Sequence, residues 1–301
     1  MKDKILITGG AGFIGKHLIE KLEDKKTIHV LDDMSAKGSS SIAGPTYHHI
    51  DMANQNAVTQ FFEDEGKFEI VYHLASDSVI EKDNFESYRR NVDGTANMLE
   101  AMVKHGIQNM VYSSGGAVYG ETMLSSSEGD ALDPISLYGS SKVASESLIR
   151  TCAHKHSIKF WIFRFSTVVG SGMDHGVIHD FLHSYKEHGK IHIHGDGNQR
   201  SNFIHVDDVV KTLTNLEMIP VNTVYNLSSD DTTSVNEVAT LIGSALKRHV
   251  EFVYLDPLKG HTQFNCPVNT KLRSVGWKPS MSSSQAVEKA ARELAEEILK
   301  R

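Results

Sequence analysis

The chain has 301 residues, of which 40% are hydrophobic, so it is long enough to bury a core and extensive disorder is not expected. Its formal net charge is −7 at pH 7, and it has no run of about five or more Lys or Arg that would follow a phosphate backbone, so nucleic acid is not an expected partner. Two cysteines, Cys152 and Cys266, are too few for a disulfide framework, and no apolar stretch approaches the ~18 residues of a membrane helix. The apolar run at the N-terminus is also too short for a signal peptide, so we expect a cytoplasmic protein with no membrane partner.

In the first half of the chain, short β-branched runs alternate with longer segments of helical period, a pattern typical of βαβ units. The predicted strands are Lys4–Thr8, Ile28–Leu31, Tyr47–Ile50, Ile70–His73, Met110–Ser113 and Phe160–Phe163, and the predicted helices are Gly12–Leu22, Asn56–Glu63, Phe85–His105 and Leu137–His156. Right-handed crossovers between such strands produce a doubly wound, Rossmann-like parallel sheet, an α/β fold whose ligand crevice lies at the carboxyl ends of the strands.

The second half of the chain has a different rhythm, with shorter elements and turn-rich stretches after about residue 165. We expect residues 1–165 to form the Rossmann domain and residues 166–301 to form mainly a smaller α/β lobe that binds the substrate, with some segments returning to the first domain. The closing segment, Ser283–Arg301, has the pattern of an exposed amphipathic helix ending in basic residues.

A glycine-rich turn follows the first predicted strand directly and opens the first predicted helix. Gly9, Gly12 and Gly15 recur at three-residue spacing within Thr8–Gly15. Glycine permits a tight turn and a close backbone approach, and the helix N-terminus attracts a pyrophosphate. This context predicts that residues 1–165 bind a dinucleotide.

A carboxylate follows the second predicted strand, 17 residues beyond Gly15. Asp32 is at the position where an acidic residue accepts hydrogen bonds from the adenosine ribose. Asp33 is a second candidate, although an ordinary turn aspartate is the better interpretation of it. A carboxylate repels a 2′-phosphate and no Arg follows at once, so NAD is favoured over NADP.

Tyr138 and Lys142 are one helical turn apart and should project from the same helix face. An ammonium beside a phenol favours the phenolate, so we expect Lys142 to lower the pKa of Tyr138 and make it a proton shuttle near neutrality. The pair follows the fifth predicted strand, where the crevice of such a sheet lies.

These motifs together resemble the extended short-chain dehydrogenase/reductases and, within them, the archaeal-type UDP-glucose 4-epimerases. The resemblance covers essentially the whole chain and is more specific in its first half. Besides the motifs above it rests on His73-Leu74-Ala75-Ser76, Asn91-Val92-Asp93-Gly94-Thr95, Val118-Tyr119-Gly120, His175–Phe181, Phe203–Val209 and Val275–Pro279.

The resemblance implies NAD as the cofactor and a nucleotide-linked sugar, of the UDP-linked kind, as the substrate. Phe13 and Ile14 would join the pyrophosphate turn, Asp51 and Met52 would lie against adenine, Leu74, Ala75 and Ser76 would line the cofactor, and Asn91 would support it. Tyr138 would exchange a proton with the sugar 4-hydroxyl, and Lys142 would bind the nicotinamide ribose. The family oxidises C4 of the sugar transiently and returns the hydride to the other face of a 4-keto intermediate.

The sequence departs from this family at the residue nearest to the chemistry. Gly115 stands where the family has a Ser or Thr that bonds the sugar oxygen. Ser114 is the nearest hydroxyl, although neighbouring side chains on a strand face opposite sides, and a water could instead fill the space. We take Ser114, Tyr138 and Lys142 as the candidate catalytic residues.

The substrate side of the pattern is looser. Thr167 replaces an Asn of the family, and His261 replaces an acidic residue. Arg200 is the best candidate for a diphosphate ligand, a surface Arg being the alternative, and Lys259 is a weaker candidate. Val177, in the stretch His175–Phe181, completes the predicted substrate contacts.

The leading interpretation is a 4-epimerase for UDP-glucose and UDP-galactose or their N-acetyl forms. The alternatives are a nucleotide-sugar dehydratase or decarboxylase, and a sensor or scaffold that binds NAD without turnover. Gly115 and Gly116 occupy the positions of the Asp-Glu pair of 4,6-dehydratases, which argues against those enzymes. By analogy with related enzymes, we also expect a homodimer in which Phe85–His105 and Leu137–His156 of each subunit form a four-helix bundle.

No metal site is expected from the sequence. Histidines are abundant, at 17, but His48-His49, His154/His156 and His192/His194 lie in separate segments with no convergent carboxylate or Cys pattern.

Overall fold

The computed structural model describes residues 4–36, 38–78, 83–122, 125–257 and 264–299. The chain divides into two compact units, each made of several chain segments. The first unit comprises Met1–Gly120, Ala131–Arg164 and Val210–Tyr225, and the second comprises Glu121–Asp130, Phe165–Val209 and Asn226–Arg301. None of the helices in the described part of the chain combines the length and apolarity that crossing a membrane requires.

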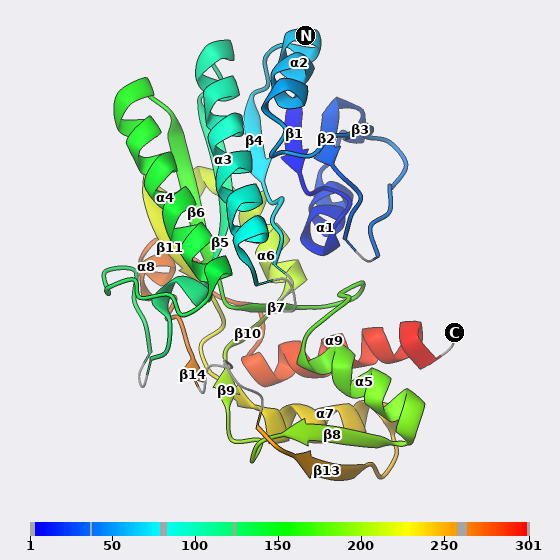
Figure 1. The fold of residues 1–301 in the computed structure, drawn as a ribbon. Coiled ribbons are helices and arrows are strands. Elements are labelled where there is room, and N and C mark those ends of the chain that lie inside the picture. The colour runs from blue at the N-terminus through cyan, green and yellow to red at the C-terminus, as the bar shows by residue number, and fades with distance from the viewer. Residues whose placement is uncertain (1–3, 37, 79–82, 123–124, 258–263, 300–301) are drawn as a thin grey trace. The chain divides into compact units, whose positions relative to one another are not determined.

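The first unit is built on a seven-stranded sheet (Figure 1). Its strands are β1 (Ile5–Thr8), β2 (Ile28–Asp32), β3 (Thr46–His49), β4 (Ile70–His73), β5 (Asn109–Gly115), β6 (Lys159–Phe165) and β11 (Thr223–Leu227). Their order is β11-β6-β5-β4-β1-β2-β3, so the strand order reverses beside β1. This is the doubly wound arrangement, which confirms the predicted Rossmann-like fold. The parallel register aligns Thr8 with both Leu31 and His73, so the segments that follow β1, β2 and β4 leave the sheet at one edge.

The helices of this unit are α1 (Phe13–Lys21), α2 (Gln55–Glu65), α3 (Phe85–His105) and α4 (Leu137–His156). Side-chain oxygens cap three of them: Asn54 accepts from Ala57 N, Asn84 from Glu86 N and Ser87 N, and Ser136 from Gly139 N. Helices α3 and α4 pack side by side. The bounds of these two helices agree with the predicted ones, because both are long, periodic and capped.

The apolar faces of α2 and α3 cover one side of the sheet. Leu6, Phe62, Val71, Met98 and Met110 are fully buried in this core. The core holds the carboxyl ends of the strands in place, and the candidate residues follow from those ends.

The second unit contains β7 (Thr167–Val169), α5 (Val177–His188), β8 (Lys190–His194), β9 (Arg200–Ser201), β10 (Phe203–His205), β12 (Thr233–Ser234), α7 (Val235–Leu246), β13 (Glu251–Leu255), β14 (Phe264–Asn265), α8 (Thr270–Ser274) and α9 (Ser283–Leu299). The boundary between the units falls within α6 (Val206–Leu213). Its strands form small sheets, β10-β7, β12-β9-β14 and β13-β8. The predicted smaller α/β lobe is therefore present. Assigning the cofactor to one unit and the sugar to the other stays a prediction.

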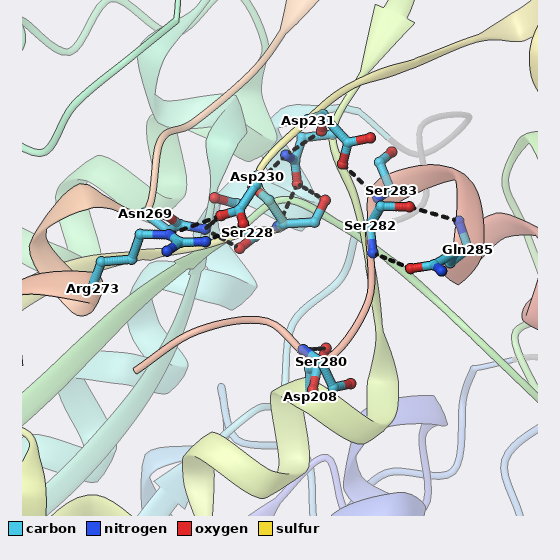
Figure 2. Close-up of polar contacts among 12 residues, drawn as sticks. Asp208, Ser228, Asp230, Asp231, Asn269, Arg273, Ser280, Ser282, Ser283 and Gln285 are labelled. Carbon is cyan, nitrogen blue, oxygen red and sulfur yellow. Dashed lines mark hydrogen bonds and ion pairs between the residues drawn. The ribbon is translucent and has the colours of Figure 1, made fainter. Parts of the chain in front are cut away.

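Helix α9 is less exposed than the sequence pattern suggests. Ala286, Val287, Ala290, Ala291 and Leu294 are buried, because the helix packs against α5, α7 and β10. Its start is held by polar contacts (Figure 2), in which Ser283 N donates to Asp231 Oδ1 at 2.7 Å and Ser282 N donates to Gln285 Oε1 at 2.9 Å.

Candidate active site

The glycine turn between β1 and α1 is too tightly packed for side chains at Gly9 and Gly15. Gly9 adopts φ +70°, and a Cβ there would lie 2.7 Å from Ala75 N. A Cβ on Gly15 would lie 2.3 Å from Gly9 O. Gly12 caps α1 with no side-chain hydrogen bond, which leaves the helix N-terminus available to an anion. This cradle fits a dinucleotide pyrophosphate, as predicted for Gly9, Gly12 and Gly15; Phe13 and Ile14 form the first turn of the helix.

Asp32 ends β2 next to that turn. Its Oδ2 accepts a hydrogen bond from Ala11 N at 2.9 Å, and its Oδ1 accepts one from Met34 N at 2.8 Å. Burial raises the pKa of Asp32, while these two backbone bonds act in the opposite direction. The backbone thus orients the carboxylate beside the glycine turn, where a ribose ligand is predicted.

Asp33 forms an ion pair with Arg90, a contact that the sequence did not predict. Arg90, on α3, lies 2.5 Å from Asp33 Oδ2 and 3.4 Å from Asp51 Oδ2. Burial alone would raise the pKa of Asp33, but hydrogen bonds from Ser35 and Arg90 hold it below its usual value. The 57 residues between Arg90 and Asp33 leave no local signal for this contact. The structure therefore brings together Asp33 and Asp51, two predicted cofactor residues, through Arg90.

Residues 74–76, which follow β4, also have features expected of a cofactor site. Leu74 and Ala75 lie against Gly9, and Ser76 Oγ is buried without a hydrogen-bond partner among the described residues. An orphaned buried hydroxyl is costly and is expected where a ligand completes its bonding. Asn91 supports this segment, accepting from Asp77 N at 2.8 Å and donating to Asp77 O at 3.0 Å. Met52 is buried against Gly94 of α3.

Tyr138 and Lys142 lie on one face of α4, as their spacing predicts. The carboxylate of Asp83 accepts hydrogen bonds from Leu137 N and Tyr138 N and so anchors the start of the helix. Lys142 is buried, its Nζ donates to Ser113 O at 2.7 Å, and it lies 5.5 Å from the centre of the Tyr138 ring.

The predicted lowering of the Tyr138 pKa is not found. Burial around the hydroxyl raises the pKa of Tyr138 to about 12. Burial also lowers the pKa of Lys142 to about 7, with Glu146 acting in the opposite direction. Desolvation disfavours both charged forms, and it outweighs the attraction expected from the spacing alone.

Ser114 points to a partner that the sequence did not suggest. Its Oγ donates to Glu146 Oε1 at 2.6 Å, and Arg164 donates to both oxygens of Glu146, at 2.9 Å and 2.7 Å. Arg164 also donates to Tyr119 Oη at 3.0 Å. The hydroxyl proton of Ser114 is therefore committed to Glu146, which leaves it no proton to donate to a sugar oxygen.

Gly115 ends β5 in an extended conformation, with φ −152° and ψ 164°. Any residue adopts this conformation, so the missing hydroxyl is not a requirement of the backbone.

A second buried hydrogen-bond network joins β1, β4 and α3 through His73. His73 Nδ1 is 2.7 Å from Thr8 Oγ1, and its Nε2 is 3.2 Å from Thr95 Oγ1. Burial, with a smaller effect of Lys142, lowers the pKa of His73 to about 3, so this imidazole is neutral and structural.

Of the predicted substrate-binding residues, the structure describes Thr167, Val177 and Arg200. Thr167 and Val177 are half-buried at the starts of β7 and α5. The guanidinium of Arg200 is occupied by Thr232 O at 2.9 Å, Thr232 Oγ1 at 3.0 Å and Glu237 Oε2 at 3.1 Å. Lys259 and His261 lie outside the described residues.

Comparison with known proteins agrees with this geometry. The model of the NAD dependent epimerase/dehydratase family matches residues 5–228. A Methanocaldococcus jannaschii protein, provisionally named UDP-glucose 4-epimerase, is 32% identical over 95% of this chain and 96% of its own length. The crystal structure of a Thermotoga maritima UDP-glucose 4-epimerase with UDP-glucose, 26% identical, superposes with a TM-score of 0.90 over 98% of this chain and 99% of that one. A mouse dTDP-D-glucose 4,6-dehydratase is 28% identical over 95% of this chain and 87% of its own length.

Proposed function

The chain belongs to the NAD dependent epimerase/dehydratase family, and from this membership we propose that it is a 4-epimerase of UDP-linked sugars. The substrates would be UDP-glucose and UDP-galactose or their N-acetyl forms. The family is NAD dependent, which confirms the predicted cofactor. The fit of the glycine cradle, Asp32 and the orphaned Ser76 hydroxyl supports the same assignment.

The observation that carries the proposal is the placement of Tyr138 and Lys142 on one face of α4, after the β5 carboxyl end. When bound beside Gly9, Gly12 and Asp32, NAD would supply the hydride-transfer chemistry at C4 of the sugar. As a phenolate, Tyr138 would accept the proton of the 4-hydroxyl while C4 is oxidised, and it would give the proton back while C4 is reduced.

Lys142 would assist that transfer through its charge. With a pKa near 7, it carries a proton for part of the time near neutrality and can stabilise a phenolate on Tyr138. Its bond to Ser113 O fixes the ammonium under the Tyr138 ring, and Asp83 fixes the start of the helix.

The two alternative functions are weaker. A dehydratase is among the relatives, but the Asp-Glu pair expected of such enzymes is replaced by Gly115 and Gly116. A sensor that binds NAD without turnover is favoured only by the missing hydroxyl at Gly115 and by the commitment of Ser114 to Glu146. The proton exchange assigned to Tyr138 would have no use in such a protein.

The test is the Tyr138→Phe variant, assayed by separating the products after incubation with UDP-glucose or UDP-N-acetylglucosamine. We expect turnover to fall by about 10² to 10⁴ while the affinity for NAD stays nearly unchanged, because only the exchangeable proton is removed. Tyr185→Phe, on α5, is the matched control and should keep full activity. A Tyr138→Phe enzyme with parental turnover would contradict the proposal, as would a parent protein that converts none of a panel of UDP-, GDP- and dTDP-sugars.

We infer further that the protein is a homodimer formed through α3 and α4. Phe85, at the start of α3, is 65% exposed and Val103, near its end, is 37% exposed, which leaves apolar side chains for a partner helix. A cytoplasmic location stays a prediction from the sequence.

The dimer is tested by sedimentation at several protein concentrations. Val103→Glu should shift the equilibrium toward monomer, because it places a charge in the predicted bundle. Met218→Glu, at a position that is 76% exposed and outside these helices, should have no effect. A parent protein that stays monomeric at all concentrations would exclude the dimer.

A further inference from the structure

Two histidines and a glutamate meet at the edge of the seven-stranded sheet. His29 is on β2, His48 is on the edge strand β3, and Glu65 is the last residue of α2. The register pairs Leu31 with His48, so His29 and His48 are two residues apart along the sheet and face the same side. Glu65 lies on that side, since its carboxylate reaches His29.

The donor atoms of these side chains have the separations of a metal site. His29 Nδ1 lies 3.2 Å from His48 Nε2 and 3.5 Å from Glu65 Oε2, and one ligand atom from each residue lies within 4.8 Å of the others. Tetrahedral ligands at about 2.0–2.1 Å from Zn²⁺ are roughly 3.3 Å apart. We propose that His29, His48 and Glu65 bind a divalent transition-metal ion of the zinc type.

The surroundings hold the two imidazoles in place. The His48 ring lies 4.7 Å from the Phe61 ring and the His29 ring lies 5.3 Å from the Phe68 ring, both edge to face. Burial lowers the pKa of both histidines, although Glu65 acts in the opposite direction. Glu65 and His48 are partly exposed, which gives an ion access from solvent, and a water would be the fourth ligand.

Lys4 competes with the ion. Its Nζ donates to Glu65 Oε2 at 2.9 Å and to Glu65 O at 2.9 Å, so an ammonium satisfies the carboxylate when no metal is bound. A bound metal ion would therefore either displace the Lys4 ammonium from Glu65 or be weakened by its positive charge. The arrangement therefore predicts that removing the charge of Lys4 strengthens the site, whereas removing any ligand weakens it.

The site is separate from the proposed epimerase chemistry. Of the residues described, it uses none that we assign to cofactor, proton transfer or sugar. It also departs from the expectation that the chain has no metal site. His29, His48 and Glu65 are 17 to 36 residues apart in sequence, and only the packing of β2, β3 and α2 brings them together.

The test is a titration of tag-free protein with Zn²⁺, and with Co²⁺ as a spectroscopic probe. Two other His pairs could also bind metal, His179 with His183, whose rings are 4.3 Å apart, and His188 with His192, at 5.2 Å. His183→Gln and His188→Gln are therefore combined as the background. In that background we expect one bound ion, a visible Co²⁺ absorption typical of a tetrahedral site, and a rise in Tm with Zn²⁺.

The ligand variants and the Lys4 variant should change the affinity for Zn²⁺ in opposite directions. His48→Gln and Glu65→Gln should each weaken Zn²⁺ binding by at least about tenfold, since even an outer-shell partner contributes about 10- to 100-fold. Lys4→Gln should tighten it. Circular dichroism and NAD binding check that each variant is folded. His48→Gln and Glu65→Gln proteins that bind Zn²⁺ as well as the background protein would overturn the proposal, and so would a background protein that binds none. Neither result depends on epimerase activity.

Discussion

At the scale of single residues, Gly115 decides how the proposed reaction proceeds. Its extended backbone conformation is open to any residue. We expect Gly115→Ser to preserve or raise turnover, because a hydroxyl there would hold the sugar oxygen in the transition state. The measurement is kcat with UDP-glucose. A large loss of turnover in a folded Gly115→Ser protein would show that the site requires the glycine for another reason.

Ser114→Ala is made in the parent protein and in the Gly115→Ser variant. Comparing the two shows whether Ser114 replaces the hydroxyl that is absent at Gly115. Since Ser114 donates its proton to Glu146, we expect similar effects of the substitution in the parent and in Gly115→Ser. A large loss in the parent that Gly115→Ser reduces would instead show that Ser114 supplies the contact to the sugar.

At the scale of the element, α4 carries Glu146 in addition to the predicted pair of Tyr138 and Lys142. Tyr138, Lys142 and Glu146 follow one another at four-residue spacing on a single face. Glu146 and Arg164 form a buried ion pair at 2.7 Å, in which the exposed fractions of the side chains are 0% and 2%. This pair ties α4 to β6 about two helical turns from Tyr138.

Breaking this pair should be costly. Glu146→Gln leaves the Arg164 cation buried without its counter-charge, and we expect the free energy of unfolding to fall by about 3–5 kcal/mol. Urea denaturation measures the change. Glu100→Gln, at an exposed position on α3, is the control and should change stability by no more than about 0.5 kcal/mol. A decrease below about 1 kcal/mol for Glu146→Gln would mean that the pair does not hold α4 in place.

At the scale of the whole molecule, the buried Lys142 makes stability depend on pH. Its pKa is about 7 in the fold, against an ordinary value of 10.5. Between these values the unfolded chain binds a proton that the folded chain does not, so the Lys142 contribution makes stability rise with pH. Below pH 7 both states are protonated, and the full penalty of burying the ammonium applies.

Lys142→Met should remove this dependence. In NAD-free protein we expect the variant to be more stable than the parent at pH 7 by a few kcal/mol, at about 1.4 kcal/mol for each unit of pKa shift, and the difference to shrink toward pH 10. Thermal denaturation at a series of pH values measures it. A difference in Tm that is constant with pH would show that Lys142 is not buried as a neutral amine.

The sequence by itself determined the features that depend on neighbouring residues. The bounds of Phe85–His105 and Leu137–His156 follow from helical periodicity and caps. The glycine turn after the first strand, the acid 17 residues further on and the Tyr138–Lys142 spacing together predicted the Rossmann-like fold, NAD and the family. These signals are local, so a single sequence displays them.

Only the tertiary structure decided which distant side chains meet and how far burial changes their charge. Arg90 reaches Asp33 and Asp51 across the sheet edge, Ser114 and Arg164 converge on Glu146, and Glu65 joins His29 and His48. No spacing in the sequence indicates these contacts, because strand order and helix packing create them. The pKa of Tyr138 likewise moved opposite to expectation: spacing predicts a neighbouring charge, but the loss of water around the hydroxyl outweighs it, and that loss is a property of the folded chain.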